Sequence, residues 1–263
     1  MINKALAIVQ ARSSSKRLPN KVLENICGMP MIWHVVQRAK SCKFIDKVVV
    51  ATSTDRTDDH LFEFCKKNKI DVFRGSLNNV LSRFIAILKK NDSKYFVRIT
   101  GDCPLIHPDF IDAQIKSLND FDADFIQISS NSTVLEGQGV RSTSSLFHLN
   151  ERTQHLDDLE HVGSRYLNEN INCYKVLKFV IPHKLRGTKY KITVDEKLDL
   201  DLIRNVYNDL YSGLPISLLD VLSWLEDNPH MSMINKEVSN SKINVELNKR
   251  VNSGINFYGT VKW

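Results

Sequence analysis

The sequence predicts an α/β fold in which a mostly parallel sheet carries helices on both faces. Short runs of β-branched and apolar residues alternate with amphipathic stretches of helical length along most of the 263 residues, and this alternation is typical of βαβ units. The first run, Ala-Leu-Ala-Ile-Val at residues 5–9, is continuously apolar, as expected for a strand buried in a parallel sheet. Ligands of such sheets bind beyond the carboxyl ends of the strands. The loops that follow strands are therefore the first candidates for a site.

The same pattern assigns the individual elements along the chain. Strands are expected at residues 4–10, 47–52, 71–73, 95–99, 124–130 and 173–181. Helices are expected at residues 30–41, 57–68, 79–90, 108–118, 156–169 and 197–210. Residues 131–155 interrupt the alternation, and we expect them to form an excursion over a pocket or an arm that reaches a partner subunit. We expect one large domain at residues 1–225 and a C-terminal extension at 226–263 whose last apolar residues dock on another part of the protein.

The composition is that of an ordinary globular protein, with 42% hydrophobic and 25% charged residues. No apolar run approaches the roughly 20 residues of a membrane span, and the N-terminus lacks a signal-peptide pattern. We therefore expect a cytoplasmic protein with no membrane partner. The five cysteines are scattered, never in Cys-x-x-Cys spacing, and form no metal-ligand pattern with the eight histidines. This usage predicts reduced thiols and no zinc site.

The net charge of +6 comes largely from two short segments. Residues 1–21 hold five basic side chains and no acidic one, and residues 174–191 hold six basic side chains and no acidic one. Such segments suit a pocket for an anionic small molecule about as well as a nucleic-acid surface. No RNA-binding motif with interleaved aromatic residues and no helix-turn-helix pattern accompanies them. We therefore expect no nucleic-acid partner.

The loop after the first strand carries the strongest chemical signal. Residues 9–21 read Val-Gln-Ala-Arg-Ser-Ser-Ser-Lys-Arg-Leu-Pro-Asn-Lys, so backbone N–H groups, hydroxyls and positive charges gather at the end of a strand. A polyphosphate needs that combination. The segment has neither the Walker A pattern nor the Gly-x-Gly-x-x-Gly pattern. From the residues alone, a phosphate-binding loop and a solvated basic loop are equally good interpretations.

Two aspartates follow apolar, strand-like runs. Asp102 lies in Thr-Gly-Asp-Cys-Pro-Leu after the strand expected at 95–99, and Asp195 follows Lys-Ile-Thr-Val. A carboxylate at a strand end suits Mg²⁺, which is usually held by one or two carboxylates together with phosphate oxygens. Alternatively, Asp102 forms an Asx turn or a helix cap, and Asp195 is the N-cap of the helix that follows it.

Several ordered motifs give the chain a family likeness that covers roughly residues 4–212. They are the loop at 9–21, Val-Val-Ala-Thr-Ser-Thr at 49–54, Val-Phe-Arg-Gly-Ser at 72–76, Val-Leu-Ser-Arg at 80–83, Val-Arg-Ile-Thr-Gly-Asp-Cys-Pro-Leu at 97–105, Glu-His-Val at 160–162 and Thr-Val-Asp-Glu at 193–196. In this order and spacing they resemble the nucleotide-sugar cytidylyltransferases. The resemblance is greatest to the spore-coat polysaccharide biosynthesis (SpsF-type) branch, which is related to CMP-ketodeoxyoctonate and CMP-sialic acid synthetases.

The resemblance implies a Rossmann-like nucleotidyltransferase fold (GT-A-like) for residues 1–225 and a Mg²⁺-dependent reaction. CMP would pass from CTP to an anionic sugar or sugar-acid acceptor, with release of pyrophosphate, for surface polysaccharide or glycoconjugate biosynthesis. The alternatives are another NTP, a phosphosugar or phosphonate acceptor, or a catalytically inactive nucleotide-binding relative. We expect a homodimer.

The resemblance also implies roles for individual residues. Catalytic roles fall to Arg12, Lys21, Asp102 and Asp195, and the two aspartates hold the Mg²⁺. The residues expected to bind the nucleotide are Ala11, Arg12, Ser13, Lys21, Thr52, Ser53, Arg83 and Thr100. Fixed cations beside the reacting phosphate stabilise the negative charge that develops on its oxygens.

The chain departs from the family pattern in small ways near the nucleotide. Asn20 stands where glycine is usual, and asparagine also tolerates a left-handed backbone. Asn78 and Asn79 stand where the relatives usually carry acidic residues, near the place of the base. His161 has a family-like setting, and we expect it near the acceptor or at a subunit interface.

The largest departure concerns the acceptor. The close relatives tend to have acidic residues where this chain has Gly139 and Arg141. A guanidinium at this place suits a carboxylate or a phosphonate. We expect the basic segment around Lys184, Arg186 and Lys189 to add to this anion site.

Overall fold

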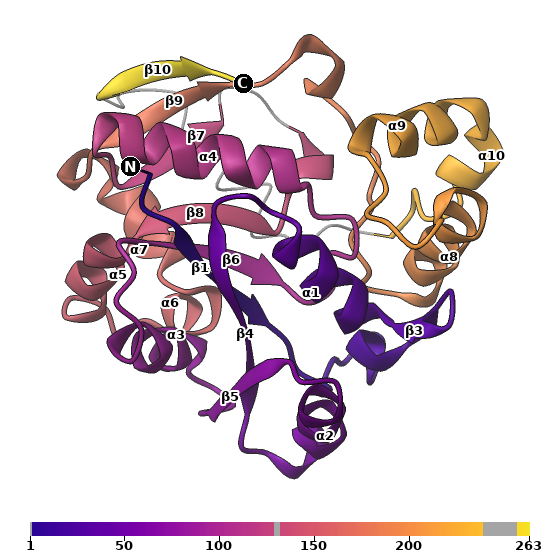
Figure 1. The fold of residues 1–263 in the computed structure, drawn as a ribbon, viewed down its shortest axis with the longest axis horizontal. Helices are drawn as coiled ribbons and strands as arrows, with labels where there is room; N and C mark the ends of the chain where they lie inside the picture. Colours follow the sequence, from indigo (N-terminus) through magenta and orange to yellow (C-terminus); the bar gives the residue numbers. More distant parts are fainter. Residues whose placement is uncertain (1, 129–131, 239–256) are drawn as a thin grey trace.

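The computed structural model describes residues 2–128, 132–238 and 257–263, and an eight-stranded sheet forms its centre (Figure 1). The strands, in their order across the sheet, are β10 (Gly259–Lys262), β9 (Val176–Val180), β7 (Phe125–Ile128), β8 (Gln138–Ser142), β6 (Tyr95–Thr100), β1 (Ala5–Gln10), β4 (Ile45–Ser53) and β5 (Asp71–Gly75). Strand β8 is antiparallel to its neighbours β6 and β7, whereas the other neighbouring pairs are parallel. A hairpin of β2 (Asn25–Ile26) and β3 (Met29–Pro30) stands apart. The expected mostly parallel sheet is confirmed.

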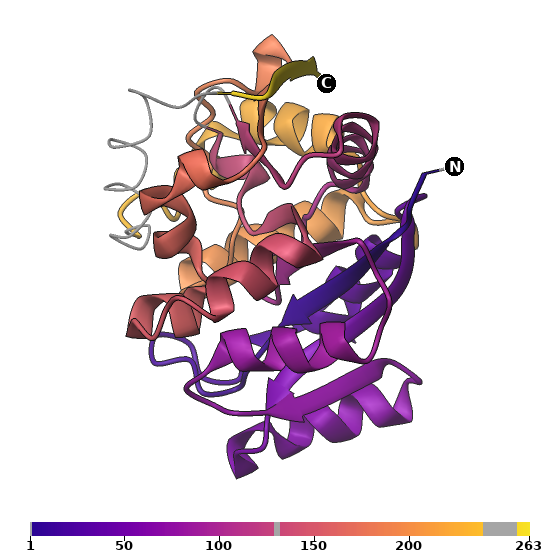
Figure 2. The same cartoon turned by 90° about the vertical axis from the view of Figure 1, so that its left-hand side faces the viewer.

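Helices cover both faces of the sheet, and successive residues of β1 point to opposite faces. On one face, Ala5, Ala7 and Val9 pack in a core with helices α1, α2 and α4. On the other face, Leu6 and Ile8 pack with helices α3 and α5 and with the start of α7. Figure 2 shows α4 and the α5–α7 group on opposite sides of the sheet. The helices of these two layers are α1 (Met31–Lys40), α2 (Asp59–Lys67), α4 (Pro108–Phe121), α3 (Val80–Lys89), α5 (Thr143–Asn150), α6 (Leu156–His161) and α7 (Ser164–Glu169).

A third core joins the C-terminal helices to the edge of the sheet. These helices are α8 (Lys197–Leu210), α9 (Leu218–Asp227) and α10 (Pro229–Ser232). The expected docking of the C-terminal residues is confirmed, because Val261 lies in β10 and the ring of Trp263 packs against His107 and Phe110. Ile255, another of the C-terminal apolar residues expected to dock, lies outside the described residues. The domain boundary expected at residue 225 falls inside α9. Within the described ranges, no helix is long and apolar enough to cross a membrane.

The structure corrects the interpretation of residues 131–155. Their described part forms β8, inside the sheet, and then α5, so it is neither an excursion over a pocket nor an arm. Strand β8 has a single apolar residue, Val140, between polar residues and Gly139. Its place is set by pairing with β6 and β7 rather than by local β-propensity, which explains why the sequence pattern missed it.

The single helix expected at 156–169 is two helices. Val162 and Gly163 both take left-handed backbone conformations, with φ of 55° and 73°, and they separate α6 from α7. A Cβ on residue 163 would lie 2.3 Å from Cδ1 of Leu149, so only glycine lets α5 approach this corner. The break turns the end of α6, with Glu160 and His161, toward the sheet.

Candidate active site

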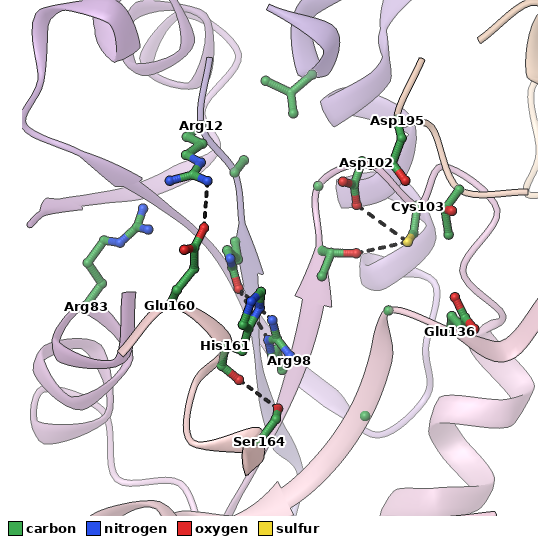
Figure 3. A pocket seen from close by; sticks show the side chains of 18 of the residues that line it. Arg12, Arg83, Arg98, Asp102, Cys103, Glu136, Glu160, His161, Ser164 and Asp195 are labelled. Carbon is green, nitrogen blue, oxygen red and sulfur yellow. Dashed lines mark hydrogen bonds and ion pairs between the residues drawn. The ribbon is translucent and has the colours of Figure 1, made fainter. Parts of the chain in front are cut away.

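A cavity of about 1070 Å³ opens at the carboxyl ends of β1 and β6 (Figure 3). Its walls are the loop after β1, the loop after β6, one face of β8, and helices α6 and α7. The expected site residues that line it are Ala11, Arg12, Lys21, Arg83, Thr100, Asp102 and Asp195. Segments far apart in the sequence thus meet at the edge of the sheet where ligands of α/β proteins bind.

A buried carboxylate that the sequence analysis did not single out holds the loop after β1. Asp58 accepts hydrogen bonds from the backbone N–H of Ser13 at 2.6 Å, the N–H of Ser53 at 3.1 Å and the Ser53 hydroxyl. Asn20 adopts the left-handed conformation expected for it, with φ of 58°, and donates to the Ser13 carbonyl. The loop is therefore shaped by the protein before any ligand binds.

Three of the expected nucleotide-binding residues do not reach the cavity. Ser13, Thr52 and Ser53 are all buried, and none of them lines the cavity wall. The Ser53 hydroxyl is bonded to Asp58, which makes it part of the support for the loop. Arg74 is likewise structural, because it donates to the Ser53 carbonyl at 2.7 Å and pairs with Asp59.

The centre of the site is a lysine held between two carboxylates. Lys21 Nζ lies 2.6 Å from Asp102 Oδ2, 3.1 Å from Asp195 Oδ1 and 2.7 Å from the Val194 carbonyl. Burial alone would lower the pKa of Lys21, but the charges of Asp102 and Asp195 raise it above its ordinary value. Three residues with expected catalytic roles are thus brought into direct contact.

A second buried carboxylate, Asp199, orients Asp195. It accepts from the backbone N–H groups of Asp195 and Glu196 at 2.9 Å each and from Lys191 Nζ at 2.5 Å. The N-cap of α8 is Glu196, so the N-cap role weighed for Asp195 is wrong by one residue. Burial alone would raise the pKa of Asp195, but the charges of Lys21 and Lys191 lower it. Asp195 is therefore ionised where it lines the cavity.

Arginines line the wall between the loop and α6. Arg12 Nη2 lies 2.7 Å from Glu160 Oε1 across the cavity (Figure 3). Arg83 is buried and donates from Nη1 to the Ala51 carbonyl, whereas its Nε and Nη2 have no partner among the described residues. Arg17 pairs with Asp195 at 2.7 Å. Asn78 also lines this wall, so the place where the relatives carry acidic residues does border the cavity.

The cavity continues down one face of the sheet to a second pair of cations. Arg98 on β6 and Arg141 on β8 both line it. His161 lies beside Arg98 (Figure 3), and Ser164 accepts a hydrogen bond from Arg141. Burial lowers the pKa of Arg98 to about 10, and burial together with the charge of Arg98 lowers the pKa of Arg141 to about 9. Both guanidiniums are charged at neutral pH. Burial and the charge of Arg98 lower the pKa of His161, so its ring is neutral.

The structure separates Arg141 from the basic segment that was expected to assist it. Lys184, Arg186 and Lys189 are exposed and do not line the cavity.

The sequence analysis did not single out Arg98, although it lies inside a recognised motif. Arg98 is the one charged residue of the strand expected at 95–99, and only the pairing of β6 with β8 brings it beside Arg141.

Comparison with known proteins places these residues in context. A profile of the family described as cytidylyltransferase matches residues 6–214. The spore coat polysaccharide biosynthesis protein SpsF of Bacillus subtilis is 31% identical over 234 residues, which cover 87% of this chain and 96% of that protein. The 3-deoxy-manno-octulosonate cytidylyltransferase of Geobacter metallireducens is 31% identical over 115 residues, or 44% of each chain.

A solved structure agrees with these matches. The structure of a cytidylyltransferase from Leptospira borgpetersenii serovar Hardjo-bovis superposes with a TM-score of 0.78 at 26% identity. The superposition covers 88% of this chain and 97% of that one. Sequence and fold therefore agree over nearly the whole length of these two proteins.

Proposed function

The chain belongs to the cytidylyltransferase family of nucleotidyltransferases, and we propose that it transfers CMP from CTP, with Mg²⁺, to an anionic sugar or sugar-acid acceptor and releases pyrophosphate. The product would be an activated donor for surface polysaccharide or glycoconjugate synthesis, which matches the name of the Bacillus relative. We further propose a homodimer, which light scattering after size-exclusion chromatography would test.

The observation that carries the proposal is the meeting of Lys21, Asp102 and Asp195 at one point. They come from the loop after β1, the loop after β6 and the segment just before α8, and all line one cavity. Beside them Arg12, together with Lys16 and Arg17, provides the positive charge that a triphosphate needs. A solvated basic loop, the alternative interpretation, would not converge on two carboxylates.

Asp102 and Asp195 fit the expected Mg²⁺. One oxygen of each carboxylate already converges on a single cation, Lys21 Nζ, and the Val194 carbonyl adds a third oxygen. No group of three or more His, Cys, Asp or Glu side chains in the described ranges is placed to hold a metal by itself. A site of two carboxylates that relies on phosphate oxygens for the rest is typical of Mg²⁺. Mg²⁺ bound there would neutralise phosphate charge during the transfer.

The chain's own residues then have definable tasks. Arg12 and Lys21 hold the phosphates while an acceptor hydroxyl attacks the α-phosphorus in line. The hydroxyl proton passes to solvent, and the bond to pyrophosphate breaks. Both must exchange partners, because Arg12 is paired with Glu160 and Lys21 with the two aspartates. No side chain needs to act as a nucleophile in this direct displacement.

Pyrophosphate release tests the proposal, measured with each of the four NTPs across a panel of acidic sugars. We expect release only when CTP, Mg²⁺ and an acidic sugar are present together. Equal release with ATP or GTP would contradict the cytidine assignment. CTP binding without turnover on any acceptor would instead favour an inactive nucleotide-binding relative.

A phosphosugar or phosphonate acceptor is the second candidate. It is favoured by one observation, the pair of cations formed by Arg98 and Arg141, which face the same cavity as the catalytic candidates. Anionic sugars that carry a phosphate or phosphonate therefore belong in the same panel.

A further inference from the structure

Arg98 and Arg141 flank an open gap in the floor of the cavity. In the β6–β8 ladder, Arg98 lies opposite Gly139, and Arg141 is two residues further along β8. Diagonal neighbours of this kind share a face and lie about 7–8 Å apart. Apart from Gly139 and its two chain neighbours, no residue has an atom within 4 Å of the point that a Cβ of Gly139 would occupy. The missing side chain therefore leaves space between the two guanidiniums.

Neither guanidinium is in contact with a carboxylate of the described residues. Arg98 donates from Nε and Nη2 to the Gln10 amide oxygen at 3.3 and 3.2 Å. Arg141 donates from Nη1 to the Val162 carbonyl at 2.8 Å and from Nη2 to the Ser164 hydroxyl at 3.2 Å. These acceptors are all neutral, and no ion pair within the described part of the chain involves either arginine.

Two cations held close together with no carboxylate in contact oppose the folded state, since partly buried charge costs free energy unless it is paired. Their neutral partners fix the direction of each guanidinium but leave Nη1 of Arg98 and Nε of Arg141 without a partner among the described residues. The two guanidiniums are therefore held in place to bind an anionic group of a ligand.

The number of charges indicates which anion. A carboxylate carries one negative charge, so even when it accepts hydrogen bonds from both guanidiniums it balances only one of their two charges. A phosphate or phosphonate has three free oxygens and up to two negative charges, so that it can bridge diagonal neighbours and balance both. The neutral ring of His161 adds no competing charge.

We propose that Arg98 and Arg141 form a subsite, above Gly139, for a doubly charged phosphate or phosphonate group on the acceptor. This inference rests on the proposed function, because it takes the other end of the cavity to be occupied by CTP. The two arginines select the acceptor by this group, while the loop after β1 holds the triphosphate.

The test uses the full chain with Mg²⁺ and saturating α,β-methylene-CTP, which occupies the triphosphate site and prevents turnover. Inorganic phosphate, methylphosphonate and acetate are then titrated at constant ionic strength by calorimetry and thermal shift. We expect phosphate and methylphosphonate to bind and acetate to bind at least about tenfold more weakly. Arg98→Met and Arg141→Met should each weaken phosphate about tenfold or more, and the exposed Arg56→Met should leave it unchanged.

The outcomes separate the two proposals. If the CTP analogue does not bind, the proposed function fails. If the analogue binds but phosphate and methylphosphonate do not, or bind equally to both arginine variants and the wild type, this inference alone is overturned. If acetate binds as tightly as phosphate, and this binding is lost in both methionine variants, the subsite binds a carboxylate and the proposal of a doubly charged group is overturned.

A second pair of variants guards against a failure to fold. Arg98→Lys and Arg141→Lys keep the charge but not the planar fork of donors. We expect them to retain part of the phosphate affinity, between the values of the wild type and the methionine variants. Full affinity in both methionine variants, or none in the wild type, contradicts the subsite whichever variants fold.

Discussion

The two ends of the cavity hold cations in opposite ways. At the loop end, Lys21 is paired with Asp102 and Asp195, and Arg12 with Glu160. On the sheet face, Arg98 and Arg141 have only neutral partners. Lys21 and Arg12 at the loop end are already ion-paired without a ligand, so substrate and Mg²⁺ must displace existing ion pairs there. The sheet face is unbalanced and needs only an anion.

The difference indicates a division of labour. A site that exchanges one set of charges for another suits phosphates whose bonds are made and broken. A preformed cationic pocket suits a group that is only held during the reaction, because its donors need no rearrangement. The following variants break or sharpen this contrast.

The largest effect is expected where charge is exchanged. Asp102→Ala and Asp195→Ala should each lower turnover by roughly two orders of magnitude or more. Each variant removes a proposed ligand of the Mg²⁺ that would compensate the negative charge of the phosphates. Pyrophosphate release measures turnover, and circular dichroism checks the fold. Variants that lose their fold, while the folded fraction keeps full activity, would show that these aspartates serve only as structural residues.

Lys21→Met should abolish most turnover and also destabilise the protein. Removing one partner of a largely buried pair leaves two carboxylates facing each other, at a cost of roughly 3 kcal/mol. Lys21 has a raised pKa, so its stabilisation is complete below its ordinary pKa of 10.5 and is lost as pH rises through the folded value. Wild type and variant should therefore differ most near neutral pH and converge in alkali.

Urea unfolding across this pH range measures the difference, with millimolar Mg²⁺ as an added arm. Mg²⁺ without nucleotide should stabilise Lys21→Met more than the wild type, because the cation that occupied the carboxylates is gone. Equal stabilisation of both proteins would show that Lys21 does not compete with the metal.

Asp58→Asn tests whether the loop is shaped in advance. Asparagine keeps one acceptor oxygen but leaves a buried N–H of Ser13 or Ser53 without a partner, which costs about 1–3 kcal/mol. The KM for CTP should rise while the acceptor KM stays constant, because only the loop end is disturbed. A stability loss with both KM values unchanged would reduce Asp58 to a purely structural residue.

The sequence predicted most of this organisation because apolar periodicity reports burial directly. It identified the alternating strands and helices, and it brought Lys21, Asp102 and Asp195 into one hypothesis through motifs. It missed α9, although Leu218, Val221, Leu222 and Leu225 have helical spacing that would have revealed it. The Ser53 side chain was expected at the nucleotide, yet the structure buries it against Asp58.

The remaining features depend on pairing between distant segments. Nothing local distinguishes Asp58 from a solvated residue at a helix start, because its partner Ser13 is 45 positions away. Strand β8 lacks an apolar run, so its place beside β6 arises only in the folded sheet. The meeting of Arg98 with Arg141 follows from that pairing and was invisible for the same reason.

The smallest effect separates the two ends of the cavity most sharply. Arg98→Met removes a partly buried cation that has no carboxylate partner, and methionine fills much of its volume. The lost hydrogen bonds to Gln10 and the relieved cost of an unpaired charge oppose each other. We therefore expect the free energy of unfolding of the ligand-free protein to change by less than about 1 kcal/mol, against roughly 3 kcal/mol for Lys21→Met. Urea unfolding of both variants without Mg²⁺ or nucleotide makes the comparison. A loss for Arg98→Met as large as that for Lys21→Met would mean that Arg98 is retained for its bond to Gln10. The contrast between the ion-paired Lys21 and the unpaired Arg98 would then disappear.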